Sequence, residues 1–239
     1  MSEDKIESYA QWGDDVLVWE YFEKKTDGVF LEAGANSPKI LSQTYLLEKR
    51  GWSGVLVEPV PECCENLRAE RSGSQIFQNA LGSPDQRGVL RLSIPSGLSE
   101  LASALKDGEE VGADDKVFEA ELMTLTEVLD AAGVSHLDYL SLDLEGMELE
   151  AMQGLDFKRF KPALVIVEDR LDNLSRHHYL KGNGYKLVRR NGSNHWYVPV
   201  AHPFEVSAGT KLRLFRKLYL SMPFRRFRDF SRKLRGKAQ

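Results

Sequence analysis

The chain has only two cysteines, and they are the neighbours Cys63 and Cys64. Adjacent cysteines can pair only in a strained geometry, and they lack the spacing of zinc ligands. The sequence therefore excludes a disulfide framework and a cysteine-based metal site. We expect two free thiols, as is usual in a reducing compartment.

Long apolar runs are also missing. No stretch approaches the roughly 18 apolar residues that a transmembrane helix needs. Residues 1–23 are acidic and lack the apolar segment of a secretory signal. We therefore expect a cytoplasmic protein that does not span a membrane.

The third shortage is of glycine in the first predicted βαβ unit. A strand over 28–33 leads into a turn at Gly34, and a second strand, over 55–58, ends in Glu58. This order is typical of a nucleotide-binding unit whose acid binds ribose hydroxyls. A pyrophosphate-binding turn needs further glycines, whereas Glu32 and Asn36 flank this one, and an acid would repel phosphate.

S-adenosylmethionine suits this turn better than a dinucleotide does. The compound has an ammonium group that Glu32 could hold and a ribose that Glu58 could bind. It carries no phosphate. The sequence therefore favours this cofactor.

Strand and helix patterns alternate from residue 28 to residue 198. This alternation predicts a mostly parallel sheet with helices on both faces and a ligand beyond the carboxyl ends of the strands. We divide the chain into an N-terminal lid or helix (1–27), an α/β domain (28–200) and a C-terminal extension (201–239).

Two segments within the domain carry specific expectations. Residues 40–49 have helical spacing and are predicted to form a helix. Residues 88–94 and 117–123 alternate like antiparallel strands, which predicts a hairpin-like insertion over 83–123. We expect this insertion to cover the acceptor side of the site, with an idle loop as the alternative.

Polar side chains follow several of the predicted strands. Any one of them could simply cap the next helix. Because the carboxyl ends of parallel strands meet at one edge of a sheet, we expect the set to form one site. Its members are Glu32, Glu58, Asn79, Asp143 and Glu168.

Two longer motifs make the pattern specific. Residues 52–59 read Trp-Ser-Gly-x-x-x-Glu-Pro, and residues 140–146 read Leu-Ser-x-Asp-x-Glu-Gly. With these motifs the chain, from about Tyr9 to Val198, resembles the FkbM family of S-adenosylmethionine-dependent methyltransferases. The resemblance implies the class I methyltransferase fold, which is a Rossmann-like α/β fold with a seven-stranded, mostly parallel sheet.

The resemblance also implies which residues bind the cofactor. Glu32, Gly34 and Asn36 would surround its methionine part, and Asp143 would lie near the transferred methyl group. Residues Asp14 and Asp15 would belong to an N-terminal lid, with an acidic surface helix as the alternative. The full implied set is Gln11, Glu32, Gly34, Ala35, Asn36, Glu58 and Pro59, with Asn79 and Ala80 beside adenine, and Asp143.

Methylation of a hydroxyl group requires alignment of the acceptor and a base that removes its proton. Our candidate catalytic residues are Asp143, Glu168 and His177. The neighbouring His177 and His178 point about 100° apart on a helix, so at most one can face inward. Other possible bases are Glu145, Asp169, His178 and His195.

A divalent metal could serve in place of a strong base. Asp143, Glu168 and Asp169 offer hard oxygen ligands that suit Mg²⁺. In the alternative without metal, Glu145 caps a helix and Glu168 binds acceptor hydroxyls.

The C-terminal sequence is strongly basic. Residues 211–239 carry 11 Lys or Arg and one acid, so this tail has a charge of +10 and the rest of the chain −14. Its apolar stripes predict two amphipathic helices hinged at Pro223, which would bind an anionic membrane through residues 211–235. The stripes disfavour nucleic acid. The alternative is packing on the body or on a second copy, as a homodimer.

These features predict an enzyme that methylates a hydroxyl of a sugar or lipid-linked glycan and that can bind peripherally to the inner face of the membrane. One alternative is a catalytically silent, membrane-tethered scaffold with the same fold. The other is a methyltransferase that acts on a nitrogen or a carboxyl group of a small molecule.

Overall fold

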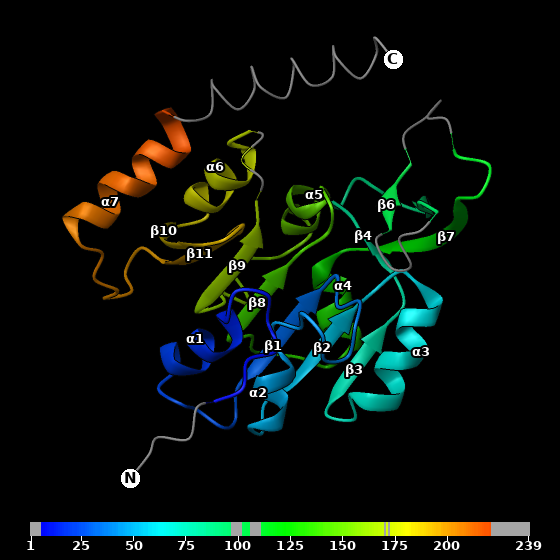
Figure 1. Cartoon of the computed structure of the whole chain (residues 1–239), viewed down its shortest axis with the longest axis horizontal. Helices are drawn as coiled ribbons and strands as arrows, with labels where there is room; N and C mark the ends of the chain where they lie inside the picture. Colours follow the sequence, from blue (N-terminus) through cyan, green and yellow to red (C-terminus); the bar gives the residue numbers. More distant parts are fainter. Residues whose placement is uncertain (1–5, 97–101, 106–110, 170, 172, 221–239) are drawn as a thin grey trace. The chain divides into compact units, whose positions relative to one another are not determined.

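The computed structural model describes residues 6–96, 102–105, 111–169, 171 and 173–220. It divides into two compact units, Met1–Ile166 and Val167–Gln239. Figure 1 shows the elements of both units along the chain.

Four parallel strands form the sheet of the first unit, in the order β8-β1-β2-β3. Ala33 at the end of β1 pairs with Val57 of β2 and with Leu142 of β8, so these three strands end level. Nearly every side chain of β1, β2 and β8 is buried, as expected of a parallel sheet that is covered on both faces. The strands are β1 (Val29–Ala33), β2 (Ser53–Val57), β3 (Ser74–Phe77) and β8 (Tyr139–Leu142).

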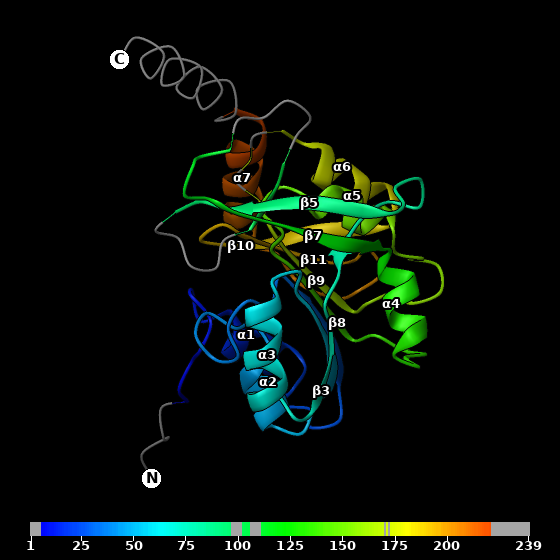
Figure 2. The ribbon, with the colours of Figure 1, turned by 90° about the vertical axis from the view of Figure 1, so that its right-hand side faces the viewer.

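Helices cover both faces of these strands. Figure 2 shows α1, α2 and α3 on one face and α4 on the other. Pro61 opens α3 at a position where its missing N–H is harmless. Thr124 and Glu127 form a capping box that starts α4. The helices of this unit are α1 (Asp14–Tyr21), α2 (Tyr45–Lys49), α3 (Pro61–Glu70), α4 (Leu125–Ala131) and α5 (Glu148–Gln153).

The helix predicted over 40–49 is only half present, because α2 begins at Tyr45. Residues before it form a loop in which Ile40 and Leu41 are 74% and 59% exposed. The helix predicted from the spacing of apolar residues is therefore wrong for residues 40–44. The physical reason is the buried carboxylate of Glu32, which takes hydrogen bonds from this loop and is described below.

The predicted antiparallel hairpin is confirmed, because β5 pairs with β7 from Val89↔Glu121 to Ile94↔Lys116. Both strands belong to a small second sheet with the order β4-β7-β5-β6. Leu92, Ala120 and Ala80, one residue from each of three of its strands, pack together in a buried cluster. Its strands are β4 (Ala80–Leu81), β5 (Val89–Ile94), β6 (Ser103–Ala104) and β7 (Lys116–Met123).

The second unit consists of a hairpin and the helices around it. Strands β10 and β11 are antiparallel, with an irregularity between Leu187 and Arg189. Strand β9 crosses the boundary between the units, and the complete strand order is β10-β11-β9-β8-β1-β2-β3. The expected mixed α/β class with a large, mostly parallel sheet is thus confirmed. The elements are β9 (Leu164–Glu168), α6 (Ser175–Gly182), β10 (Tyr185–Asn191), β11 (Asn194–Pro199), α7 (Ala208–Phe215) and a π-helical turn, η1 (Arg216–Leu220).

The first part of the basic tail is α7 and η1, and α7 lies against β10. Leu214 and Leu218, two residues of its predicted apolar stripe, are only 8% and 5% exposed. This part of the stripe therefore packs on the protein, as the alternative interpretation held. The predicted hinge at Pro223 and the second helix lie outside the described residues. No helix within the described ranges combines the length and apolarity needed to cross a bilayer.

Candidate functional site

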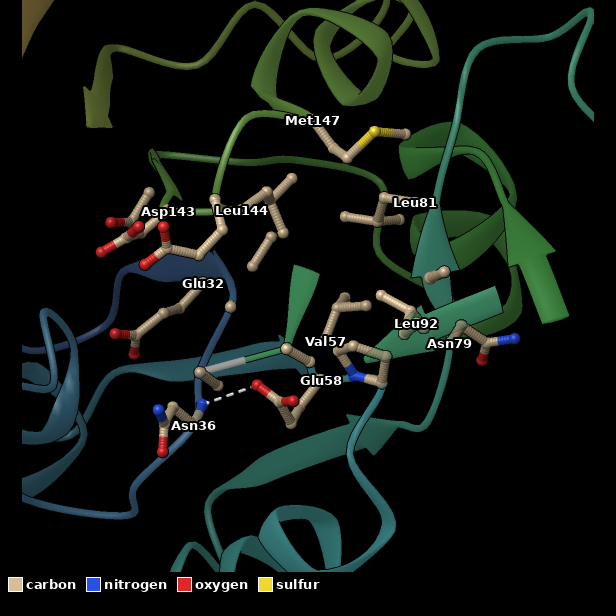
Figure 3. A pocket seen from close by; sticks show the side chains of 18 of the residues that line it. Glu32, Asn36, Val57, Glu58, Asn79, Leu81, Leu92, Asp143, Leu144 and Met147 are labelled. Carbon is tan, nitrogen blue, oxygen red and sulfur yellow. Dashed lines mark hydrogen bonds between the residues drawn. The ribbon is translucent and has the colours of Figure 1, made fainter. Parts of the chain in front are cut away.

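A cavity of about 290 Å³ opens at the carboxyl ends of β1, β2 and β8, all within the first unit. Figure 3 shows Asn36 and Glu58 on one side of it, with Asp143 and Leu144 across from them. The cavity brings together every predicted cofactor residue except Gln11, which is exposed and does not line it. Those residues are Glu32, Gly34, Ala35, Asn36, Glu58, Pro59, Asn79, Ala80 and Asp143.

The turn at Gly34 ties the three strand ends together. The main-chain N–H groups of Gly34 and Ala35 both donate to the carbonyl oxygen of Val57, at 2.9 and 3.3 Å. Gly34 has a φ of +79°, and a Cβ atom there would lie 1.8 Å from the main-chain oxygen of Asp143. Only glycine suits a left-handed turn so close to another strand. The sequence pattern had indicated the turn, but not its contact with β8.

Glu58 directly follows β2, and its carboxylate is held by two main-chain donors. Oε2 accepts from the N–H of Asn36, as Figure 3 shows, and Oε1 accepts from the N–H of Val60, both at 2.9 Å. Glu58 also lines the cavity, and carboxylate oxygens are good acceptors for ligand hydroxyls. Glu58 is therefore pre-oriented to bind a pair of ligand hydroxyls.

Glu32 is more deeply engaged than the sequence suggested. Its carboxylate accepts from the hydroxyls of Ser42 and Thr44 and from the main-chain N–H of Gln43. Burial raises the pKa of Glu32, while the positive charge of Arg71 and these hydrogen bonds act in the opposite direction. The carboxylate that we assigned to a ligand ammonium thus also anchors the loop before α2.

Arg71, at the end of α3, was missed by the sequence analysis. It is almost fully buried, forms an ion pair with Glu48 at 2.8 Å, and donates to the hydroxyls of Ser42 and Thr44. The residue therefore holds the same loop as Glu32, from the other side. A single arginine near a polar helix end carries no sequence signal of this role.

Apolar residues form the other part of the lining. Leu81, Leu92 and Met147 border the cavity, as Figure 3 shows. Leu90, Leu92, Ala102 and Ala104 come from the small second sheet and its connections. An apolar wall beside a carboxylate that can bind ribose fits the adenosine part of S-adenosylmethionine. The residues present therefore fit the implied cofactor.

The loop after β8 carries two carboxylates at the edge of the cavity. Carboxyl oxygens of Asp143 and Glu145 lie within 4.8 Å of one another. Glu145 has a φ of +51°, which is unusual for a residue with a side chain. Glu148, which we had not singled out, braces this loop by accepting from the N–H groups of Leu144 and Gly146.

The N-terminal acids are not on the surface. Asp14 and Asp15, at the start of α1, are fully buried. The carboxylate of Asp15 accepts from the hydroxyl of Ser8 at 2.5 Å and from the N–H of Tyr9 at 2.7 Å. The alternative of an acidic surface helix is therefore wrong, because Asp15 ties the preceding segment to α1.

Five candidate residues lie in the second unit: Glu168, Asp169, His177, His178 and His195. Glu168 is the last residue of β9 and is half-buried. The next residue, Asp169, is 1% exposed, and its Oδ1 accepts from Arg176 at 2.9 Å and from the N–H of Leu171 at 2.7 Å. The charge of Asp169 is thus balanced by an arginine, and a metal ligand at this position stays a prediction.

His177 is surrounded by tyrosines. Its Nδ1 lies 3.2 Å from the hydroxyl of Tyr197, and its Nε2 lies 3.4 Å from that of Tyr219. Burial lowers the pKa of His177. His177 does not line the cavity, and its role as the base stays a prediction.

His195, another candidate base, is fully buried in β11, with its Nδ1 3.6 Å from Oδ2 of Asp169. Burial lowers the pKa of His195 to about 4, against the attraction of Asp169. In the unfolded chain the pKa of this ring is near 6.5. Between pH 6.5 and pH 4 the unfolded chain therefore binds more protons than the folded chain does. The free energy of unfolding should therefore fall by up to about 3 kcal/mol as the pH drops from 6.5 to 4.

This prediction can be checked by urea unfolding across that pH range. We expect His195→Gln to reduce the pH dependence. His178→Gln removes an exposed histidine of the same unit and should leave it unchanged. An equal slope in the wild type and His195→Gln would contradict the assignment.

Comparisons with known proteins agree with this description. The sequence model for the methyltransferase FkbM domain matches residues 32–187. No curated protein matches the chain.

Solved structures with a similar fold include a methyltransferase domain of METTL16, at 10% identity and a TM-score of 0.47, covering 82% of this chain and 69% of that one. A precorrin-6y C5,15-methyltransferase from Geobacter metallireducens has 11% identity and a TM-score of 0.42, covering 83% and 94%. The family match includes the strand ends and the turn at Gly34 that form the cavity. The chain belongs to the FkbM family and is an S-adenosylmethionine-dependent methyltransferase.

Proposed function

We propose that this methyltransferase acts on a hydroxyl group of a sugar, either free or in a lipid-linked glycan. The observation that carries the proposal is the pair of carboxylates at the edge of the cavity, Asp143 and Glu145. Carboxylates are good acceptors for the hydroxyl groups that line a sugar, and one of them can remove a proton. The exposed Ile40 and Leu41 offer an apolar contact on the same cavity, which suits an acceptor attached to a lipid.

The residues of the cavity divide the work of binding. Glu58 would hold the ribose hydroxyls, Asn36 and the Gly34 turn the methionine part, and Leu81 and Leu92 the adenine. The bound sulfonium supplies an activated methyl group. The protein then has to align the acceptor oxygen in line with that group, which can lower the barrier by up to about 7–11 kcal/mol.

Asp143 is the residue that we propose as the general base, because it follows β8 directly and is exposed at the cavity. A positioned base contributes roughly 10²–10⁴ in rate. We therefore expect Asp143→Asn to lower kcat by about 10²–10⁴ while the Kd for S-adenosylmethionine changes by less than about fivefold. Single-turnover kinetics and isothermal titration calorimetry measure these two quantities.

Two further measurements define the role of Asp143. Asp156→Asn removes a carboxylate outside the cavity and should leave kcat unchanged. Treatment with EDTA tests the other role considered for Asp143, a share in binding Mg²⁺, and activity that EDTA leaves unchanged supports removal of the proton by Asp143 itself. Loss of activity in EDTA that Mg²⁺ restores would contradict a metal-free mechanism.

The acceptor can be identified with S-adenosylmethionine carrying a tritiated methyl group. The full-length enzyme would be incubated with cell-envelope extract, and the labelled products would be divided by their stability in alkali. A methyl ether on a sugar survives alkali, whereas a methyl ester releases labelled methanol. Alkali-stable label that glycosidases convert to labelled monosaccharide supports the proposal, and label only in esters or amines would refute it.

We further propose that the basic C-terminal sequence associates with an anionic membrane surface. Residues 211–239 carry 11 basic residues, and Leu212 and Phe215 of α7 are exposed. Each cation near such a surface contributes on the order of 1 kcal/mol. Because Leu214 and Leu218 are buried, a useful truncation must keep α7 and η1.

We expect full-length protein to float with vesicles that contain phosphatidylglycerol, and protein that ends at Leu220 to float much less. Cutting at Thr210 instead would remove two buried leucines and should lower the melting temperature. Equal flotation of the full-length protein and the Leu220 truncation would contradict a membrane role for residues 221–239.

A further inference from the structure

The second unit has a cavity of its own, apart from the methyltransferase residues. It has a volume of about 610 Å³ and lies between β10, the turn at Gly192, the segment before α7 and α7 itself. Figure 1 shows α7 beside the β10–β11 hairpin. A volume of this size is in the range of sites for small molecules, roughly 300–1,000 Å³.

The charge of this cavity is unbalanced. Four cationic side chains line it, those of Arg189, Arg190, Arg213 and Lys217, against the single carboxylate of Glu205. Such a concentration of one sign in a hollow focuses the electrostatic field and attracts a counter-ion of the opposite sign. The cavity therefore favours an anionic ligand.

Two of the four cations contact neutral groups and no carboxylate. The guanidinium of Arg189 lies over the ring of Trp196, 5.0 Å from its centroid. Nη2 of Arg213 lies 3.4 Å from the hydroxyl of Thr210. Within the part of the chain that the structure describes, neither Arg189 nor Arg213 forms an ion pair with an acid. Their placement on β10 and α7 holds them at two walls of the cavity.

Neutral donors complete the lining. Ser207 caps α7 and Thr210 lies in its first turn, and both border the cavity. The amino end of a helix carries a partial positive charge that adds to the field of the arginines. Hydroxyl groups and guanidinium groups together are the usual ligands of phosphate oxygens.

We propose that this cavity binds a phosphate-bearing ligand, with Arg189 and Arg213 as its principal contacts. A guanidinium group presents a planar fork of N–H donors that matches two phosphate oxygens at once, a geometry that the ammonium of lysine lacks. Two arginines that form no ion pair with a described acid suit a ligand with two negative charges, such as a diphosphate, better than a single carboxylate. The ligand can be a soluble phosphorylated compound or the headgroup of a phospholipid, because both present the same oxygens.

Pyrophosphate titrated into the full-length protein at low ionic strength tests the proposal. We expect saturable binding that Arg213→Gln weakens at least tenfold. Lys211→Gln removes the same charge from the same helix outside the cavity and should change the Kd less than twofold. The melting temperature of each variant, measured in parallel, reports that it is folded. Absence of saturable binding, or equal weakening by both variants, would overturn the proposal.

A second arm identifies the source of the phosphate. The same variants would be sedimented with vesicles of phosphatidylcholine alone or with phosphatidylglycerol. If Arg213→Gln weakens both pyrophosphate binding and binding to the anionic vesicles, the ligand includes a lipid headgroup. If it weakens only pyrophosphate binding, the ligand is soluble. Because Arg189 packs on Trp196, Arg189→Gln serves only as a supporting variant, with its melting temperature measured in parallel.

Discussion

Replacing Gly34 by alanine is expected to abolish binding of S-adenosylmethionine and to destabilise the fold by more than about 3 kcal/mol. The left-handed backbone at this position, with φ of +79°, costs a residue with a side chain about 1–2 kcal/mol. In addition, the new Cβ atom would lie 1.8 Å from the main-chain oxygen of Asp143, so the end of β8 would have to move. That movement displaces the proposed base and one wall of the cavity together.

Gly133 supplies the matched control for this substitution. It also has a left-handed backbone, with φ of +69°, but nothing lies within 4 Å of the place where a Cβ would stand. Gly133→Ala should therefore cost about 1–2 kcal/mol and leave cofactor binding unchanged. Urea unfolding and calorimetry on both variants measure the difference. If Gly34→Ala and Gly133→Ala lowered the free energy of unfolding equally, the predicted clash between the new Cβ atom at position 34 and Asp143 would be contradicted.

The residues at the strand ends could be predicted because the strands themselves have a clear pattern. Short, continuous apolar runs such as residues 55–57 predict strands that are buried on both faces of a parallel sheet. The polar residue that ends each run must then lie at the same edge of that sheet. Gly34, Glu58 and Asp143 follow three neighbouring strands that end level. Their meeting in one cavity is a direct consequence of that register.

The loop over 40–44 could not be predicted, because its conformation depends on a contact made across the fold. Local spacing favoured a helix. Burying the carboxylate of Glu32 without donors would cost several kcal/mol, and Ser42, Gln43 and Thr44 supply those donors only when they are not helical. A preference for helix, worth a few tenths of a kcal/mol per residue, is too weak to compete.

The surroundings of the candidate residues in the second unit could not be predicted, for a related reason. Asp169 and His177 are of the residue types that catalyse reactions and bind metals, and sequence alone does not show what lies opposite a side chain. In the structure, Arg176 neutralises Asp169, and tyrosine hydroxyls lie beside both ring nitrogens of His177. Buried polar groups need partners in any fold, so a buried acid or histidine indicates a site only when its partners leave it accessible.

Glu58→Gln is expected to weaken binding of S-adenosylhomocysteine, the product form of the cofactor, by about 10- to 100-fold. Hydrogen bonds from ligand hydroxyls to a charged group contribute about 1.5–3 kcal/mol, and an amide presents one acceptor where the carboxylate presents two. The substitution also affects the protein itself, because Glu58 accepts from the N–H groups of Asn36 and Val60. Calorimetry on the variant alone therefore cannot separate the two effects.

A ligand without the ribose hydroxyls separates them. If Glu58 binds those hydroxyls, a 2′,3′-dideoxy analogue should bind the wild type about as weakly as the complete ligand binds Glu58→Gln. The affinity of the analogue should then fall little further when Glu58 is replaced by Gln, because the analogue already lacks the hydroxyls that Glu58 would bind. Two losses that simply add would mean that Glu58 acts only by shaping the turn at Asn36. Nearly complete non-additivity, with an unchanged melting temperature, would place the ribose at the end of β2, where Glu58 follows the strand.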